Sequence, residues 1–367
     1  MCIPVNYYPD RQARCEPLPK VKLTKTDRMN FIKTIGRRII FPIVISTHSE
    51  LLLSAFTKNK LLILNYHGVV KKSDPKISPN HLSLEQFTKH IQYLSKNFNI
   101  VSLTDIFSIH QQKLSVDKKT IAITFDDGYE NNFLNAFPVL QKFSAPATIF
   151  VTAQAVENSS EPLWYDALDI SKSGLRWEEF KLDERILNNQ EFKPLLNSSS
   201  FSEFKNKLKN LPAIKKAEVF RSLLPSEVLE NSKNSTDSEY WKLLSNEQMR
   251  TLAGSGLIEI GSHGYSHTNL DILPLDELNV ELVRSRKLLE TVIQKKVISL
   301  AFPDGAYNEK VKMASREAGY THLCAVNYRW PNDQLDNSIL PRLSISNTTT
   351  FESVMIQIHR AFKYSGF

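Results

Sequence analysis

Cysteine is scarce in this sequence, and its scarcity excludes two kinds of site. The 367 residues contain three cysteines, Cys2, Cys15 and Cys324. Thiols this widely separated cannot form a disulfide framework or a zinc site built from cysteines. Their low number fits a protein of a reducing compartment.

Long apolar runs are also missing. No stretch reaches the roughly 20 apolar residues that a membrane-spanning helix needs. Ile39–Ser46 is apolar, but Pro42 interrupts it, and His48 and Glu50 follow. The N-terminus does not have the pattern of a cleavable signal peptide, and we expect a cytoplasmic protein.

An excess of basic charge is absent from most of the chain. The formal net charge is +7, and residues 11–40 alone hold nine basic and two acidic side chains. A basic globular face for nucleic acid is therefore not indicated. Residues 11–56, a basic run followed by short apolar runs, could instead lie on an anionic membrane surface. The alternative is a disordered tail that leads into a first helix, and a chain that started at Met29 would lack residues 1–28.

From residue 60 onward, short apolar segments alternate with helical patterns, and tandem repeats are absent. The segments expected to be strands are 61–64, 100–103, 120–125, 147–151, 257–260, 297–302 and 323–326. This alternation predicts an α/β fold with a parallel sheet, closed or open. Ser83 with Gln86, and Ser245 with Gln248, have the spacing of capping boxes at helix starts.

Residues 157–240 interrupt the alternation. The stretch is rich in Asn, Ser and Lys, and Phe201, Phe204 and Leu208 lie at helical spacing. We interpret it as a mainly helical insertion. The predicted organisation is a basic tail with a leading helix (1–58), a main domain that carries the insertion (59–350) and a C-terminal helix (351–367).

Two adjacent carboxylates follow the expected strand 120–125. Asp126 and Asp127 come directly after Phe125 and precede Gly128. Like charges this close cannot both ionise freely without a cation or a shared proton. The alternative is an ordinary Asp-Gly turn.

Two histidines follow the expected strand 257–260. His263 and His267 are four residues apart, a spacing that puts both imidazoles on one face of a helix. Because the C-terminal ends of parallel strands share one rim, we expect the pair to meet Asp126 and Asp127 there. One carboxylate and two imidazoles form a three-ligand metal set with open positions for water and substrate, and the second carboxylate is free to act as a base.

These motifs resemble those of the polysaccharide deacetylases of carbohydrate esterase family four. The resemblance rests on Thr124–Gly128, Ser262–His267 and Phe302–Tyr307, and Leu64–His67 and Leu340–Arg342 are similar to flanking motifs of bacterial members. It extends from about residue 60 to about residue 345, apart from the insertion. The resemblance implies a deformed (β/α) barrel with fewer than eight regular units. It also implies hydrolysis of N-acetyl groups on amino sugars of a glycan.

The resemblance also implies roles for individual residues. Asp127, His263 and His267 would hold a divalent metal, usually Zn²⁺ in this family, with Co²⁺ or Ni²⁺ as alternatives, and Asp126 would be the base. The chemistry of these residues agrees, because a bound cation lowers the pKa of its water towards about 7 and a neighbouring carboxylate can take the proton. A backbone N–H near Asp304 would help to stabilise the oxyanion.

The sequence departs from the family pattern near the base and the acid. Ala301 stands where the family often has an arginine that orients the base, and we expect Arg342 to supply this charge from a different strand. The late Leu-x-His motif that usually supplies the acid is not visible. We predict His67 as the acid, with His322 and His359 as lower-ranked alternatives.

Three residues are predicted substrate contacts. Asp304 and Tyr307 belong to the third motif, and Asp304 stands where an aromatic residue is common, which could alter the subsite or repel anionic substrates. Trp164 is the third: with Tyr165 and Asp166 at the start of the insertion, it could line a sugar site, because an aromatic face stacks on the C–H face of a sugar ring. The alternative is that these aromatic side chains anchor the insertion to the core.

The sequence therefore predicts a metal-dependent hydrolase that removes N-acetyl groups from amino sugars of a cell-surface polysaccharide, such as one of the bacterial envelope, or its precursor. An O-acetyl carbohydrate esterase that uses the same site is one alternative. A non-catalytic glycan-binding relative is another. The expected partner is an N-acetylated glycan, and the sequence does not give the oligomeric state.

Overall fold

The computed structural model describes residues 60–172, 193–198, 200–213, 215, 216, 219 and 236–364. The predicted N-terminal tail, with its membrane contact through residues 11–56, lies outside these ranges. None of the helices within them combines the length and the apolar character that crossing a bilayer requires.

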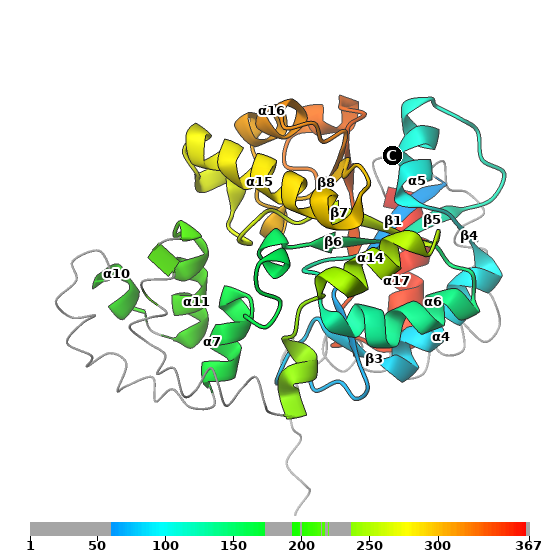
Figure 1. Ribbon diagram of the computed structural model, residues 1–367. Helices are drawn as coiled ribbons and strands as arrows, with labels where there is room; N and C mark the ends of the chain where they lie inside the picture. The colour runs from blue at the N-terminus through cyan, green and yellow to red at the C-terminus, as the bar shows by residue number, and fades with distance from the viewer. Residues whose placement is uncertain are drawn as a thin grey trace, which may run out of the picture.

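Parallel strands form a sheet that curves towards a barrel (Figure 1). In the described part of the chain the sheet holds nine strands: β1 (Leu61–Tyr66), β4 (Asn99–Ile100), β5 (Thr120–Phe125), β6 (Ala147–Val151), β7 (Ile258–Ser262), β8 (Ser299–Ala301), β9 (His322–Ala325), β10 (Ile339–Pro341) and β11 (Leu343–Ser344). Their order in space is β10-β9-β8-β7-β6-β5-β1-β11, and β4 pairs with the first residues of β5. A separate parallel pair joins β2 (Gly68–Val70) to β3 (His81–Ser83).

One segment brings the two edges of the large sheet together. Only Arg342 separates β10 from β11, yet β10 pairs with β9 and β11 pairs with β1. The chain thus passes from one edge of the sheet to the other within a few residues. This arrangement confirms the predicted deformed barrel.

The strand residues face two apolar clusters in alternation, as the period of two along a strand requires. Ile63, Ala122, Phe150, Ala301, Cys324 and Leu340 belong to the interior cluster, which also includes the buried face of α5 (Leu103–Gln111). A Cβ at Gly261 would lie 2.5 Å from Cδ1 of Phe150, so only glycine leaves room for this ring. Beyond this cluster, towards the C-terminal ends of the strands, the interior side chains are polar, and there they build the site.

The other faces of the strands pack under helices. These helices are α4 (Leu84–Asn97), α6 (Phe137–Lys142), α14 (Asn246–Gly254), α15 (Leu275–Ile293), α16 (Glu309–Glu317) and α17 (Phe351–Tyr364). The predicted capping boxes are present at the starts of α4 and α14. A π-helical turn, Asn132–Ala136, precedes α6.

The described part of the predicted insertion is helical. It contains α7 (Trp164–Lys172), α10 (Lys193–Leu196) and α11 (Phe201–Lys209), which lie beside the barrel on the left of Figure 1. These helices have an apolar cluster of their own that includes Leu168, Phe204 and Leu208. The described residues of the predicted insertion are thus mainly helical, and the rest of the stretch lies outside the described ranges.

Candidate active site

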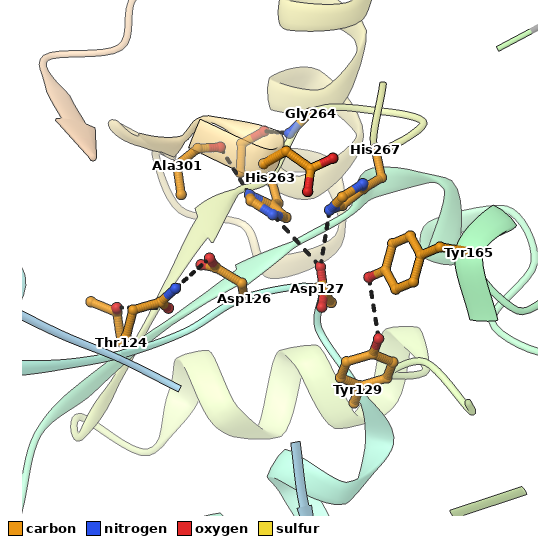
Figure 2. Close-up of polar contacts among 12 residues, drawn as sticks. Thr124, Asp126, Asp127, Tyr129, Tyr165, His263, Gly264, His267 and Ala301 are labelled. Carbon is orange, nitrogen blue, oxygen red and sulfur yellow. Dashed lines mark hydrogen bonds and ion pairs between the residues drawn. The ribbon is translucent and has the colours of Figure 1, made fainter. Parts of the chain in front are cut away.

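Polar side chains from strands far apart in the sequence meet at the C-terminal rim of the barrel (Figure 2). They line a pocket of about 340 Å³, a size that suits a small ligand or one end of a larger one. The predicted site residues in its lining are His67, Asp126, Asp127, His263, His267 and Asp304. The segments predicted to share one rim of the barrel therefore do meet there.

Asp127, His263 and His267 form one buried cluster. Oδ1 of Asp127 lies 3.6 Å from Nε2 of His263 and 3.3 Å from Nε2 of His267. One ligand atom from each residue lies within 4.8 Å of the others. Oδ1 of Asp127 is buried and has no hydrogen-bond partner among the described residues, so the donor set fits a divalent cation.

The charge state of Asp127 also suits a metal ligand. Burial alone would raise the pKa of this carboxyl group. The imidazole of His267, 3.3 Å away, and the nearby His67 and His263 instead bring the pKa well below its ordinary value. The carboxylate therefore stays ionised.

The two histidines do not share a helix, and the expectation from their spacing was wrong in this respect. His263 follows β7 directly, and the chain then runs as a loop in which Gly264 has φ 76° and His267 has φ 53°. Two left-handed residues turn the loop back so that both imidazoles face Asp127. A spacing of four residues thus gives the same convergence here without helical geometry.

Hydrogen bonds outside the cluster fix the orientation of this loop. Nδ1 of His263 lies 2.9 Å from the carbonyl oxygen of Ala301 and can donate to it, which leaves Nε2 free to bind a metal. Glu281 of α15 accepts hydrogen bonds from the backbone N–H of Tyr265 at 2.7 Å and of Ser266 at 3.2 Å. Ala301 thus supports a ligand through its backbone at the position where the family often has an arginine side chain.

The backbone turns into a left-handed conformation directly after Asp126. Asp127 has φ 76° and Gly128 has φ 82°, the left-handed region that side chains other than glycine rarely adopt. Because of this turn the side chains of the two neighbours point in different directions. The carboxylate of Asp126 points away from the imidazoles, and that of Asp127 points towards them (Figure 2). Strain of this kind is typical of functional sites.

Asp126 is held by Arg342 and Asn65. Nη1 and Nη2 of Arg342 donate to Oδ1 and Oδ2 of Asp126 at 2.7 and 2.9 Å, and Asn65 donates to Oδ2 at 2.9 Å. Burial alone would raise the pKa of Asp126, but the charge of Arg342 keeps it below the ordinary value. The paired strands β1 and β5 place Asn65 beside Thr124, and both side chains also contact Arg342. Arg342 therefore lies where the sequence predicted a charge from a different strand.

His67 lies on the pocket wall, while its two alternatives as acid do not. Nδ1 of His67 is buried without a hydrogen-bond partner among the described residues, and Asn132 of the π-helical turn holds its backbone carbonyl at 2.7 Å. His322 stacks on Phe107 of α5, with ring centroids 4.4 Å apart. His359 lies on α17, with Nε2 3.0 Å from the hydroxyl oxygen of Tyr93. Neither lines the pocket.

Asp304 lines the pocket as expected, but its charge is balanced. Lys209 of α11 donates to Oδ1 of Asp304 at 2.7 Å. Burial alone would raise the pKa of Asp304, but His267 and Lys209 bring it below the ordinary value. The repulsion of anionic substrates considered from the sequence is therefore reduced by a residue of the insertion.

Two predicted substrate contacts lie outside the pocket and need correction. Trp164 is 8% exposed, and its Nε1 donates to the carbonyl oxygen of His267 at 3.1 Å, so it supports the histidine loop. Tyr307 is fully buried, and its hydroxyl donates to Oδ2 of Asp333 at 2.7 Å. We therefore omit Trp164 and Tyr307 from the residues that contact substrate.

Sequence reasoning missed several polar residues of the pocket wall, among them Asn65 near the end of β1 and Lys205 and Lys209 of α11. Asn65 had a signal in the sequence, since it precedes His67 by two residues and so shares its strand face. The two lysines come from the insertion, for which periodicity gives no orientation relative to the barrel.

Comparison with known proteins agrees with this site. A model of the polysaccharide deacetylase family matches residues 113–181 and 226–323, which include both carboxylates and both histidines. The chain therefore resembles the polysaccharide deacetylase family over the two segments that carry the site.

Curated relatives are similar to parts of this chain. A putative polysaccharide deacetylase of Bacillus subtilis, YxkH, is 21% identical over 71% of this chain and 62% of its own length. A poly-β-1,6-N-acetyl-D-glucosamine N-deacetylase of Staphylococcus aureus is 32% identical over 26% of this chain and 37% of its own length. The chain thus spans less than two thirds of either relative.

Solved structures share the fold. IcaB from Ammonifex degensii has a TM-score of 0.53 and 17% identity, with 83% of this chain and 99% of that chain covered. The Streptococcus pyogenes deacetylase PplD, determined in complex with acetate, has a TM-score of 0.52 and 16% identity, with 81% and 96% covered. At these identities the likeness extends to the fold alone.

Proposed function

We propose that this protein is a metal-dependent hydrolase that removes N-acetyl groups from amino sugars of a cell-surface polysaccharide or its precursor. The observation that carries this proposal is an ionised carboxylate, Asp126, held by Arg342 next to a buried set of metal ligands. A binding protein has no need for a base beside such a set. A hydrolase that activates water needs both.

In this proposal Asp126 is the base. Asp127, His263 and His267 would hold a divalent cation, which would lower the pKa of a bound water and polarise the acyl group. Arg342 and Asn65 fix the Asp126 carboxylate so that one orientation faces the pocket. Asp126 takes the proton of the water as the oxygen adds to the acyl carbon.

His67 is the proposed acid. The C–N bond of the amide breaks only if the departing sugar amine receives a proton, and His67 is the histidine of the pocket wall that is not part of the ligand set. Its Nδ1 has no hydrogen-bond partner among the described residues.

The relatives favour an N-acetylated glycan as substrate. The staphylococcal relative is named for poly-β-1,6-N-acetyl-D-glucosamine, and a β-1,6-linked N-acetylglucosamine oligomer is therefore the first substrate to test. Zinc is the proposed metal, because two imidazoles and one carboxylate suit its preferred ligands. Co²⁺ and Ni²⁺ are the alternatives.

Acetate release tests the proposal. The full chain, supplied with Zn²⁺, Co²⁺ or Ni²⁺ in turn, is incubated with β-1,6- and β-1,4-linked N-acetylglucosamine oligomers and with O-acetylated xylan. We expect metal-dependent release from an N-acetylated oligomer, and a loss of about 10²- to 10⁴-fold in Asp126→Asn with unchanged metal content. Release from xylan alone would favour the esterase, and no release from any substrate would contradict the proposed enzyme.

A further inference from the structure

Tyr165 of α7 brings a hydroxyl group to the pocket wall opposite the base. Its ring packs edge-on against His267, with ring centroids 4.8 Å apart. In Figure 2 its hydroxyl points towards Asp127, and Asp126 lies on the other side of Asp127. The resemblance to known deacetylases assigned no role to this residue.

The hydroxyl of Tyr165 is the outer end of a chain of polar groups. It lies 3.2 Å from the hydroxyl of Tyr129, which lies 3.0 Å from Oδ2 of Asp166. Tyr129 is 2% exposed and Asp166 is 3% exposed. The chain thus runs from a buried carboxyl group to the pocket through groups that water scarcely reaches.

Such a chain has two possible directions, because each phenol has one proton to donate. If Asp166 is ionised, Tyr129 donates to Asp166 and Tyr165 donates to Tyr129, so Tyr165 presents only lone pairs to the pocket. If Asp166 carries a proton, it donates to Tyr129, Tyr129 donates to Tyr165, and the proton of Tyr165 faces the pocket.

The surroundings favour the second direction, in which Asp166 is protonated and Tyr165 donates into the pocket. Burial raises the pKa of Asp166 well above its ordinary value, and the charge of Asp169 adds to this effect. Lys205 opposes it, but its ammonium group is paired with Asp169 at 2.6 Å.

We propose that Tyr165 is a catalytic residue that donates a hydrogen bond to the acyl oxygen of the substrate as this oxygen becomes negatively charged, and that Tyr129 and Asp166 are positioning residues that direct its proton into the pocket. The inference rests on the proposed deacetylase function. A water that gives its proton to Asp126 adds to the acyl carbon from the Asp126 side. The acyl oxygen is then left facing Tyr165, where a prearranged donor stabilises the charge that develops.

Steady-state kinetics of hydroxyl-deleted variants test this role, with the most active N-acetylglucosamine oligomer as substrate. Tyr165→Phe should lower kcat on the order of 10²-fold and leave KM and metal content unchanged. Tyr93→Phe is the matched control, because the hydroxyl of Tyr93 on α4 also contacts another side chain, that of His359, but lies outside the pocket. Its kcat should equal that of the wild type.

Variants of Asp166 test the direction of the chain. Asp166→Asn keeps a donor towards Tyr129 and should retain most of kcat, whereas Asp166→Leu and Tyr129→Phe should each lower it about 10-fold, less than loss of the donor itself. Equal losses in Asp166→Asn and Asp166→Leu would overturn the positioning role.

Failure of this inference differs from failure of the proposed function. If the wild type releases acetate and Tyr165→Phe keeps its full kcat, or changes only KM or metal content, Tyr165 is not a catalytic donor and the deacetylase stands. If the wild type releases no acetate from any N-acetylated oligomer, the function itself falls, and the inference falls with it.

Discussion

Asp126 and Asp127 are neighbours in the sequence but have entirely different partners in the folded chain. Asp126 is bound by a guanidinium and an amide inside the barrel, and Asp127 faces two imidazoles. The left-handed turn at Asp127 makes this separation possible. Two adjacent carboxylates can therefore both stay ionised, each with its own compensating groups.

Removal of Arg342 should damage both stability and the base. Arg342→Met leaves the Asp126 carboxylate buried without its partner, and we expect the free energy of unfolding to fall by about 3–5 kcal/mol. Because Arg342 lowers the pKa of Asp126, its loss should move the acid limb of the kcat/KM profile to higher pH. Chemical denaturation and a pH–rate profile measure the two effects.

A double variant controls for general damage to the core. In Arg342→Met combined with Asp126→Asn no uncompensated charge is left, so the stability loss should be smaller than the sum of the two single losses. Additive losses would show that the ion pair is not the source of the stabilisation.

Replacement of His67 separates acid catalysis from metal binding. His67→Gln should lower kcat by about 10²- to 10⁴-fold, because no proton reaches the departing amine, while metal content stays that of the wild type. Release from an O-acetylated sugar should suffer less, since an alcohol leaves more easily than an amine. Full activity of the variant on an N-acetylated oligomer would exclude His67 as the acid.

At the scale of elements, a buried anion fixes the chain after β9. Asp333 is fully buried and accepts hydrogen bonds from Nζ of Lys312 at 2.7 Å and from the hydroxyl of Tyr307 at 2.7 Å. The backbone N–H groups of Arg329 and Trp330 also donate to it, each at 3.0 Å. Tyr307 therefore has a structural partner 26 residues later in the chain, which no local pattern could reveal.

Asp333 should make the free energy of unfolding depend on pH. Burial alone would raise its pKa, but Lys312 and the other donors bring it below the ordinary value. Its contribution is therefore present above the unfolded pKa of about 3.9 and is lost as the pH falls through the folded-state pKa. Asp333→Asn should lower the free energy of unfolding at pH 7 by about 1.5–3 kcal/mol.

Denaturant unfolding between pH 7 and pH 3 measures this effect. The difference between Asp333→Asn and the wild type should shrink as the pH falls. Asp117→Asn, an exposed carboxyl in the turn before β5, should follow the wild-type curve throughout. A difference for Asp333→Asn that stays constant over this range would contradict the account.

The sequence predicted the elements best where local patterns determine them. The strands β5 and β6 and the capping boxes of α4 and α14 depend on apolar runs and on side chains three residues apart. The histidine loop was predicted in the right place but with helical geometry, because a spacing of four residues does not reveal left-handed turns. The sequence indicated Trp164 and Tyr165 together and could not choose between them, since only the docking of α7 decides which of two adjacent aromatic residues faces the pocket.

At the scale of the whole molecule, closure of the barrel and assembly of the site are one event. The segment that carries Arg342 pairs with β9 on one side and with β1 on the other. Its position is therefore fixed only when both edges of the sheet are formed, and Asp126 gains its partner at that moment. The sequence predicted the barrel and a charge from a different strand. It could not show that Arg342, which supplies this charge, also lies where the two edges of the sheet meet.

Outside the barrel, the insertion contributes residues to the site. Helices of the insertion add Tyr165, Lys205 and Lys209 to the pocket wall, so the insertion takes part in the site. The expected contact of residues 11–56 with a membrane surface and the cytoplasmic location stay predictions.

Asp127, His263 and His267 are proposed to hold a divalent cation beside an ionised Asp126. Elemental analysis of the purified chain, incubated with Zn²⁺, Co²⁺ or Ni²⁺ and then dialysed, measures this binding. We expect stoichiometric metal in the wild type and in Asp126→Asn, and a large loss in His263→Ala and His267→Ala. A wild-type protein that retains none of the three metals, or histidine variants that retain as much as the wild type, would contradict it.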